Sequence, residues 1–178
     1  MKLYVARHGQ TNYNDLGLCN ADPSVDVHLT KDGIGQVEGL SERLKHIDID
    51  QIFVSELKRT KQTAEILNKY HDAPVATDAR LNDNRTGYEG LDYRKYLAAL
   101  DSAENKWSVR LNDGESLEDV RVRIRSFLDS LKSKDFDAVL IVTSMFIVQA
   151  IYGVVHDLSY QEAWDLQVDK ASCIELEL

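Results

Sequence analysis

The feature that most constrains the fold is an uninterrupted apolar run of five residues, Ala138-Val139-Leu140-Ile141-Val142. A strand with one wet face alternates apolar and polar residues, whereas a run without polar residues is typical of a strand covered on both faces. Other elements must therefore lie on each side of the sheet that contains this run. We expect the strand to be central in that sheet.

Shorter patterns predict further strands and helices in alternation. Apolar runs predict strands at residues 3–6, 51–54 and 75–77, and the alternation at 174–178 predicts a last strand with one wet face, at an edge. Polar caps and helical spacing predict helices that begin at Thr30, at Ser116 and at Ser159, and others after Ser55, near 93–100 and over 145–152. The helix after Thr30 is expected to bury Ile34, Val37, Leu40 and Leu44, and residues 12–27 are expected to form a loop. This order predicts an α/β fold, a three-layer α/β/α sandwich with a mostly parallel sheet, built as one domain from residues 1–178.

Bulk properties narrow the classes of partner. The formal net charge of −9 over 178 residues argues against nucleic acid or an acidic membrane as a partner, because both need a positive face. Cys19 and Cys173 lie far apart and form no metal-ligand spacing, which predicts free thiols in a reducing compartment. The chain enters a strand pattern at Lys2, and its apolar runs are too short to cross a bilayer. We therefore expect a cytoplasmic location.

The pentapeptide Arg7-His8-Gly9-Gln10-Thr11 follows directly on the first predicted strand. The carboxyl ends of strands are where open α/β sheets bind ligands, so this strand brings a guanidinium and an imidazole to such a place. A guanidinium forks onto two phosphate oxygens, and an imidazole kept neutral by a nearby positive charge can attack phosphorus. A histidine at the end of a strand is more often a hydrogen-bonded structural residue, so three residues alone do not establish catalysis.

Two later junctions carry polar groups that can converge on the same edge of the sheet. Arg59 comes shortly after the second predicted strand, and Asp83 lies in the loop after the third. With Arg7 and His8 they would make a small anion site.

A longer series of motifs resembles the histidine phosphatase superfamily, the phosphoglycerate-mutase-like proteins. The resemblance rests on Arg7 to Thr11 with Asn14, on Leu29-Thr30 with Gly33 and Gln36, on the segment from Ser55 to Ala64, on Leu81-Asn82-Asp83 with Gly87 and Gly90, and on Gly114-Glu115-Ser116. The motifs occur in order over nearly the whole chain.

The resemblance implies roles for individual residues. It makes His8 the nucleophile that becomes phosphohistidine, and it makes Arg7, Arg59 and Asn14 phosphate-binding residues. It places Asp83 where the family has a glutamate that acts as the acid, with Glu89 as the alternative. Aspartate is one methylene shorter, which alters the reach of the proton donor. No metal and no other cofactor is expected, because the arginines neutralise the phosphoryl charge.

One departure from the family pattern follows the central strand. The family has Ser or Thr and then His-Gly there, whereas this chain reads Val142-Thr143-Ser144-Met145-Phe146. Either Ser144 replaces the second pocket histidine, or a His-Gly pair is missing before Met145, which the sequence favours. Loss of one such donor costs about 3 to 4 kcal/mol, or a factor of about 100 to 1,000 in rate. Ser144 and the amides after it are candidates to bind phosphate in its place.

The sequence supports three functions. The favoured one is a phosphomonoester hydrolase that acts through phosphohistidine on a small phosphorylated metabolite, with activity weakened by the missing histidine. The alternatives are an impaired paralogue that binds a phosphorylated or anionic ligand, and a phosphoglycerate mutase. Specificity is expected from the loops at 12–28 and 84–107, where Tyr13, Tyr88, Tyr93 and Trp107 either meet a leaving group or pack on the protein. The oligomeric state is not predicted.

Overall fold

A five-stranded sheet forms the centre of the computed structural model, which describes residues 1–178. Its strand order is β3-β2-β4-β1-β5, with β1 at Lys2–Arg7, β2 at Gln51–Val54, β3 at Val75–Thr77, β4 at Ala138–Thr143 and β5 at Cys173–Glu177. The first four strands pair in parallel, and β5 pairs antiparallel with β1.

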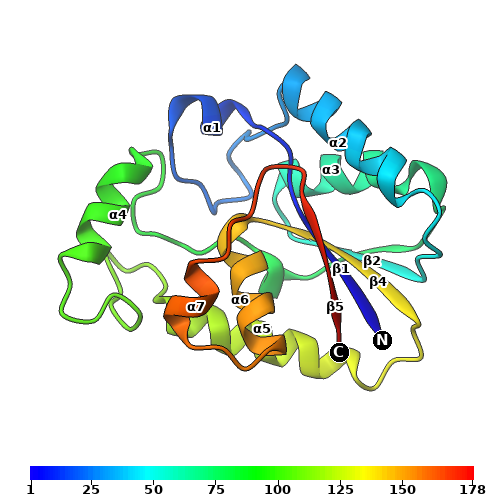
Figure 1. Cartoon of the computed structure of the whole chain (residues 1–178). Helices are drawn as coiled ribbons and strands as arrows, with labels where there is room; N and C mark the ends of the chain where they lie inside the picture. Colours follow the sequence, from blue (N-terminus) through cyan, green and yellow to red (C-terminus); the bar gives the residue numbers. More distant parts are fainter.

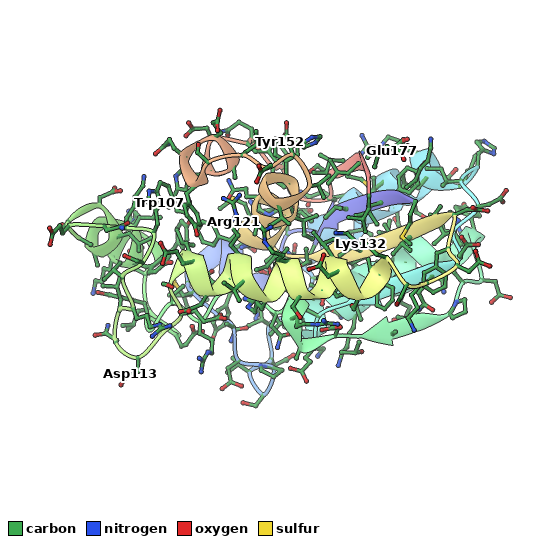
Figure 2. All side chains as sticks on the ribbon, turned by 90° about the horizontal axis from the view of Figure 1, so that it is seen from below. Trp107, Asp113, Arg121, Lys132, Tyr152 and Glu177 are labelled. Atoms are coloured by element: carbon green, nitrogen blue, oxygen red, sulfur yellow. The ribbon has the colours of Figure 1, made fainter.

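Helices cover both faces of this sheet (Figure 1). The helices α2 (Lys31–Leu44) and α3 (Lys58–Leu67) lie on one face, and α5 (Leu117–Leu131) and α6 (Met145–Val155) on the other. From below, α5 runs across the near side of the molecule, with Arg121 and Lys132 marking its course (Figure 2). The shorter helices are α1 (Asn12–Leu16), α4 (Tyr93–Asp101) and α7 (Tyr160–Trp164), with 3₁₀ turns at Asn68–Tyr70 and Ala79–Leu81. None of the helices combines the length and apolar character that crossing a bilayer requires.

The strand side chains explain the layered arrangement. Along β1, Leu3 and Val5 pack with α5 and α6, whereas Tyr4 and Ala6 pack with α2 and α3. All six residues of β4 are buried because both of its faces are covered. The predicted fold class is therefore confirmed, as are the central position of β4 and the edge position of β5.

Local predictions near the amino-terminal half of the chain were partly wrong. Residues 12–16 form the short helix α1 instead of a loop, because Thr11 and Asn14 make a reciprocal capping box. Ile34 is 40% exposed although its spacing places it with the apolar stripe of α2. The caps predicted at Thr30, Ser116 and Ser159 are all formed by side-chain hydrogen bonds.

Strand direction determines which segments meet at one edge of the sheet. Because β1, β2 and β4 are parallel, the residues that follow them emerge at the same edge. The antiparallel β5 begins at this edge, so the segment that precedes it also arrives there. The end of β1 is therefore surrounded by the segments that follow β2 and β4 and by the segment that precedes β5.

The turn after β1 packs closely on the first turn of α2. A Cβ atom on Gly33 would lie 2.1 Å from the Gln10 carbonyl oxygen, and one on Gly9 would lie 2.6 Å from the Gly33 carbonyl oxygen. The Thr30 amide donates to Gln10 O over 3.0 Å. Two glycines therefore let α2 fix the backbone that carries His8.

We predict that Gly33→Ala destabilises the protein by about 1 to 3 kcal/mol, because the added methyl group overlaps a backbone oxygen. Chemical denaturation measures the change. The control is Gly39→Ala in the same helix, where no atom lies within 4 Å of the added Cβ. This control should be neutral or stabilise by up to about 1 kcal/mol. Equal effects of the two substitutions would contradict the close approach.

Candidate functional site

A cavity of about 280 Å³ opens where the carboxyl ends of β1 and β4 meet the loops above the sheet. Its lining combines cationic, hydroxyl and aromatic groups. The residues are Arg7, His8, Thr11, Tyr13, Asn14, Gly17, Leu18, Cys19, Asn20, Val27, Arg59, Asp83, Asn84, Thr86, Tyr93, Ser144, Met145, Phe146 and Lys170.

His8 lies at the floor of this cavity and is 4% exposed. Its Nδ1 atom is 2.7 Å from the Gly9 carbonyl oxygen, which can only accept a hydrogen bond. Nδ1 therefore carries the proton, and Nε2 holds the lone pair. Arg59 Nε donates to this Nε2 over 3.2 Å. The ring is fixed with its nucleophilic nitrogen beside a guanidinium.

The surroundings keep this imidazole neutral. Burial is the largest cause that lowers the pKa of His8 well below its usual 6.5, and the charges of Arg59, Arg7 and Lys170 lower it further, against the Gly9 hydrogen bond. A neutral imidazole retains its lone pair at pH 7. His8 is thus poised as a nucleophile without needing a base to deprotonate it.

Arg7 reaches the same place from the end of β1. Its Nη1 donates to the Val168 carbonyl oxygen over 2.6 Å, which ties the side chain to the segment before β5. Its Nε is buried and has no acceptor in the protein. An unpaired buried donor costs about 1 to 3 kcal/mol, which an oxygen of a bound anion would offset. Burial lowers the pKa of Arg7, but a guanidinium stays charged at pH 7.

Arg59 enters from the first turn of α3 and is 4% exposed. Besides its bond to His8, it donates from Nη1 to Asn20 Oδ1 over 3.0 Å and from Nη2 to Asn20 O over 2.9 Å. Nη2 also lies 3.0 Å from Asp83 Oδ2. Burial lowers the pKa of Arg59, and the charge of Asp83 opposes that shift. The arginine is held by several acceptors, each of which a phosphoryl oxygen can replace.

Asp83 lies in a loop that is hydrogen-bonded to β4 and to α5. Thr143 Oγ1 donates to Leu81 O over 2.7 Å, which joins this loop to β4. Arg123 donates to the Asp83 carbonyl oxygen over 3.4 Å, and its Nε pairs with Glu115 over 2.8 Å. The Glu115 backbone is in turn hydrogen-bonded to the same loop. The Gly114-Glu115-Ser116 segment therefore holds the carboxylate beside Arg59.

Two other predicted residues lie in different surroundings. Glu89 does not line the cavity, and its carboxylate accepts from the backbone amides of Ala21 and Thr86 over 2.6 and 3.2 Å. Asn14 lines the cavity, but its Oδ1 accepts from the Thr11 amide in the cap of α1. The geometry thus brings Asp83, and not Glu89, to the predicted phosphoryl position. It leaves only the amide nitrogen of Asn14 for an anion.

Ser144 occupies the junction between β4 and α6. The register pairs Arg7 with Thr143, so Ser144 is the neighbour of His8. Its Oγ lies 3.5 Å from Arg59 Nη2, and the backbone amides of Ser144, Met145 and Phe146 donate to no acceptor within the protein. Whether Ser144 replaces the histidine or a His-Gly pair is missing after it, this placement puts the Ser144 hydroxyl beside His8. The amino end of α6 offers its amides to an anion.

Several polar residues of the cavity were not predicted as anion-site candidates, among them Asn20, Tyr93 and Lys170. Tyr93 was considered only as an aromatic surface, and it lines the cavity as Tyr13 does. Tyr88 and Trp107 do not; Trp107 stacks on Tyr160 with ring centroids 5.6 Å apart. The direction of β5 would have indicated Lys170, because an antiparallel last strand brings its preceding turn to this edge.

Comparison with known proteins agrees with the motifs and the fold. A family model described as the histidine phosphatase superfamily (branch 1) matches residues 3–178. A relative from Hydrogenobacter thermophilus with a provisional phosphoserine phosphatase name is 28% identical over 183 residues, covering 99% of this chain and 89% of the relative. A Photorhabdus laumondii relative with a provisional phosphoglycerate mutase name is 29% identical over 142 residues, covering 75% and 64%. The solved structure of a mycobacterial glucosyl-3-phosphoglycerate phosphatase with VO3 is similar at a TM-score of 0.84 and 25% identity, covering 99% and 90%.

Proposed function

Because the chain belongs to the histidine phosphatase superfamily, we propose that it hydrolyses a small phosphorylated metabolite through a phosphohistidine on His8. The observation that carries the proposal is the buried His8 ring, whose Nε2 lies beside the Arg59 guanidinium in a cavity that Arg7 also lines. This arrangement combines a ready nucleophile with preorganised charge for a phosphoryl group.

In the first step, His8 Nε2 attacks phosphorus and the bond from phosphorus to the ester oxygen breaks. Arg7 donates from its unpaired Nε to one phosphoryl oxygen. Arg59 gives up a hydrogen bond to Asn20 or Asp83 and donates to a second phosphoryl oxygen instead. The charge that develops on the equatorial oxygens is thereby held by groups already in place. The leaving oxygen takes a proton from Asp83, which releases a neutral alcohol.

In the second step, water attacks the phosphohistidine. Asp83, now ionised, accepts a proton from this water, the bond between phosphorus and Nε2 breaks, and His8 regains its neutral state. Inorganic phosphate leaves, and the enzyme returns to its starting protonation. The single carboxyl group therefore serves both steps.

Two alternatives keep specific support. The neutral Ser144 beside His8 favours a paralogue that binds a phosphorylated or anionic ligand without turnover, since a hydroxyl is a weaker donor than an imidazolium. The mutase name among the relatives favours phosphate transfer through the same histidine. We place both below hydrolysis, because the nucleophile, two arginines and a carboxyl group share one cavity.

We predict that the protein releases phosphate from 4-nitrophenyl phosphate and that His8→Ala lowers the rate to background. Continuous absorbance of nitrophenolate measures both. Calorimetric binding of inorganic phosphate separates the outcomes. Equal rates in the two proteins would end the hydrolase proposal, and phosphate binding without turnover would establish the binding paralogue.

We predict that Asp83→Asn affects substrates according to their leaving group. An alkyl alcohol must be protonated as it departs, so kcat for an alkyl phosphate should fall about 100- to 10,000-fold. Nitrophenolate leaves without a proton, so phosphorylation of His8 by its ester should slow far less. Single-turnover measurements on both substrates test this.

Glu89→Gln is the control for Asp83→Asn, because Glu89 carries the alternative carboxyl group outside the cavity. It should leave the ratio of the two rates unchanged. A leaving-group dependence that appears in Glu89→Gln and not in Asp83→Asn would assign the acid to Glu89.

A further inference from the structure

The turn at residues 169–172, just before β5, is attached to the backbone that carries the proposed nucleophile. The Ala171 amide donates to the His8 carbonyl oxygen over 3.2 Å, and the Arg7 amide donates to Ser172 O over 3.0 Å. These bonds fix the turn at the floor of the cavity. Any side chain that it directs into the cavity is therefore held close to His8.

The conformation of this turn is specific. Ala171 has φ = 50°, in the left-handed region that residues with a Cβ rarely adopt, and it is 4% exposed. Arg43 Nη2 donates to its carbonyl oxygen over 3.4 Å. Such a conformation persists only when its surroundings fix it. The residue before it, Lys170, is thus presented in a defined direction.

Lys170 lines the cavity and is half-buried. Four lysines on the surface form ion pairs with carboxylates, namely Lys2, Lys45, Lys58 and Lys132. Lys170 forms no ion pair, although Asp169 is its neighbour in sequence. Its ammonium group keeps all three donors for something that enters the cavity.

The positive charge of Lys170 acts on His8. After burial and the charge of Arg59, the charges of Arg7 and Lys170 also lower the pKa of the His8 ring. This effect agrees with the geometry, in which Lys170 and His8 line the same cavity.

The charge of the cavity shows what such a cation adds. In the phosphohistidine state between the two steps, Asp83 is ionised and neutralises Arg59 within the 3.0 Å pair. Ser144, beside His8, is neutral. The single remaining positive charge, that of Arg7, would then be opposed by a phosphate group with a charge of about −1.5 to −2 at pH 7. With Lys170 included, the excess positive charge of the cavity is about equal in magnitude to the negative charge of the phosphate group.

We propose, on the basis of the hydrolase function above, that Lys170 is the third cation of the phosphoryl site. Its ammonium group binds an oxygen of the phosphoryl group attached to or approaching His8. It thereby supplies the positive charge that the Ser144 hydroxyl does not, and it offsets the loss of the second pocket histidine.

The first test measures inhibition of 4-nitrophenyl phosphate hydrolysis by inorganic phosphate and by orthovanadate. Lys170→Met should weaken inhibition by both anions about 10- to 100-fold, as expected for loss of one hydrogen bond to a charged group. Lys170→Arg should retain most of the affinity. Lys61→Met, an exposed lysine on α3 outside the cavity, is the control and should leave inhibition unchanged. Unchanged inhibition in Lys170→Met would overturn the proposal.

The second test decides which part of the substrate Lys170 binds. Phenyl phosphate and 4-carboxyphenyl phosphate differ in the charge of their leaving groups. Lys170→Met should lower kcat/KM for both by a similar factor, because the phosphoryl group is common to both. A loss confined to the carboxylated substrate would place Lys170 on the leaving group and contradict the proposal.

The third test uses the neighbouring position. If Lys170 offsets the missing histidine, Ser144→His should raise kcat strongly in the Lys170→Met background and little in the wild type. Equal gains in the two backgrounds would show that the residues act independently and would contradict the proposal. Should the buried Ser144→His not fold, the inhibition by anions in Lys170→Met and Lys170→Arg decides the question.

Calorimetric titration with inorganic phosphate keeps the failure of this proposal distinct from the failure of the hydrolase function. It reports affinity at the site whether or not turnover occurs. Weakened phosphate binding in Lys170→Met supports the role of Lys170 even if His8→Ala is as active as the wild type. Unchanged binding removes that role even if His8 proves essential.

Discussion

The interaction on which the site depends is the contact between two buried groups, the Arg59 guanidinium and the His8 imidazole. A buried cation is costly unless acceptors surround it, and Asn20 and Asp83 provide those acceptors. Burial is the main cause that lowers the pKa of the adjacent His8 ring, and the fixed charge of Arg59 lowers it further. The same arrangement therefore disfavours protonation of His8, the proposed nucleophile, and places positive charge where the proposed phosphate would bind.

The fold supplies this contact by bringing different segments to one edge of the sheet. β1 ends at Arg7 and is followed directly by His8, α3 carries Arg59, and the loop after β3 carries Asp83. Each segment is tied down next to its functional residue, as the Thr143 bond to Leu81 O illustrates. Because the backbone is held in this way beside each functional residue, the side chains are brought close together by the fold.

Local patterns made much of this predictable from the sequence. The apolar run at 138–142 identified the central strand, and the serine and threonine caps located the helix starts, because these signals act within a few residues. The convergence of His8, Arg59 and Asp83 followed from the expectation of a mostly parallel sheet. The direction of β5 depends on pairing with β1, far away in sequence, and without it Lys170 showed no connection to the site.

Other features depended on tertiary contacts that periodicity does not encode. Ile34 fits the apolar stripe of α2 but faces solvent, and Trp107 packs on Tyr160 instead of lining the cavity. Ser144 was ambiguous because a chain read alone does not distinguish a replaced residue from a deletion. The register of β1 and β4 places it beside His8.

In the proposed reaction, His8 Nε2 forms a covalent bond to phosphorus. The most direct measurement incubates the wild-type protein with 4-nitrophenyl phosphate, quenches at alkaline pH, where phosphohistidine survives, and analyses the peptide that contains His8 by mass spectrometry. We expect one added phosphoryl group on His8 that disappears as product forms. Turnover with no modification of this peptide, or with modification of another residue, would contradict it.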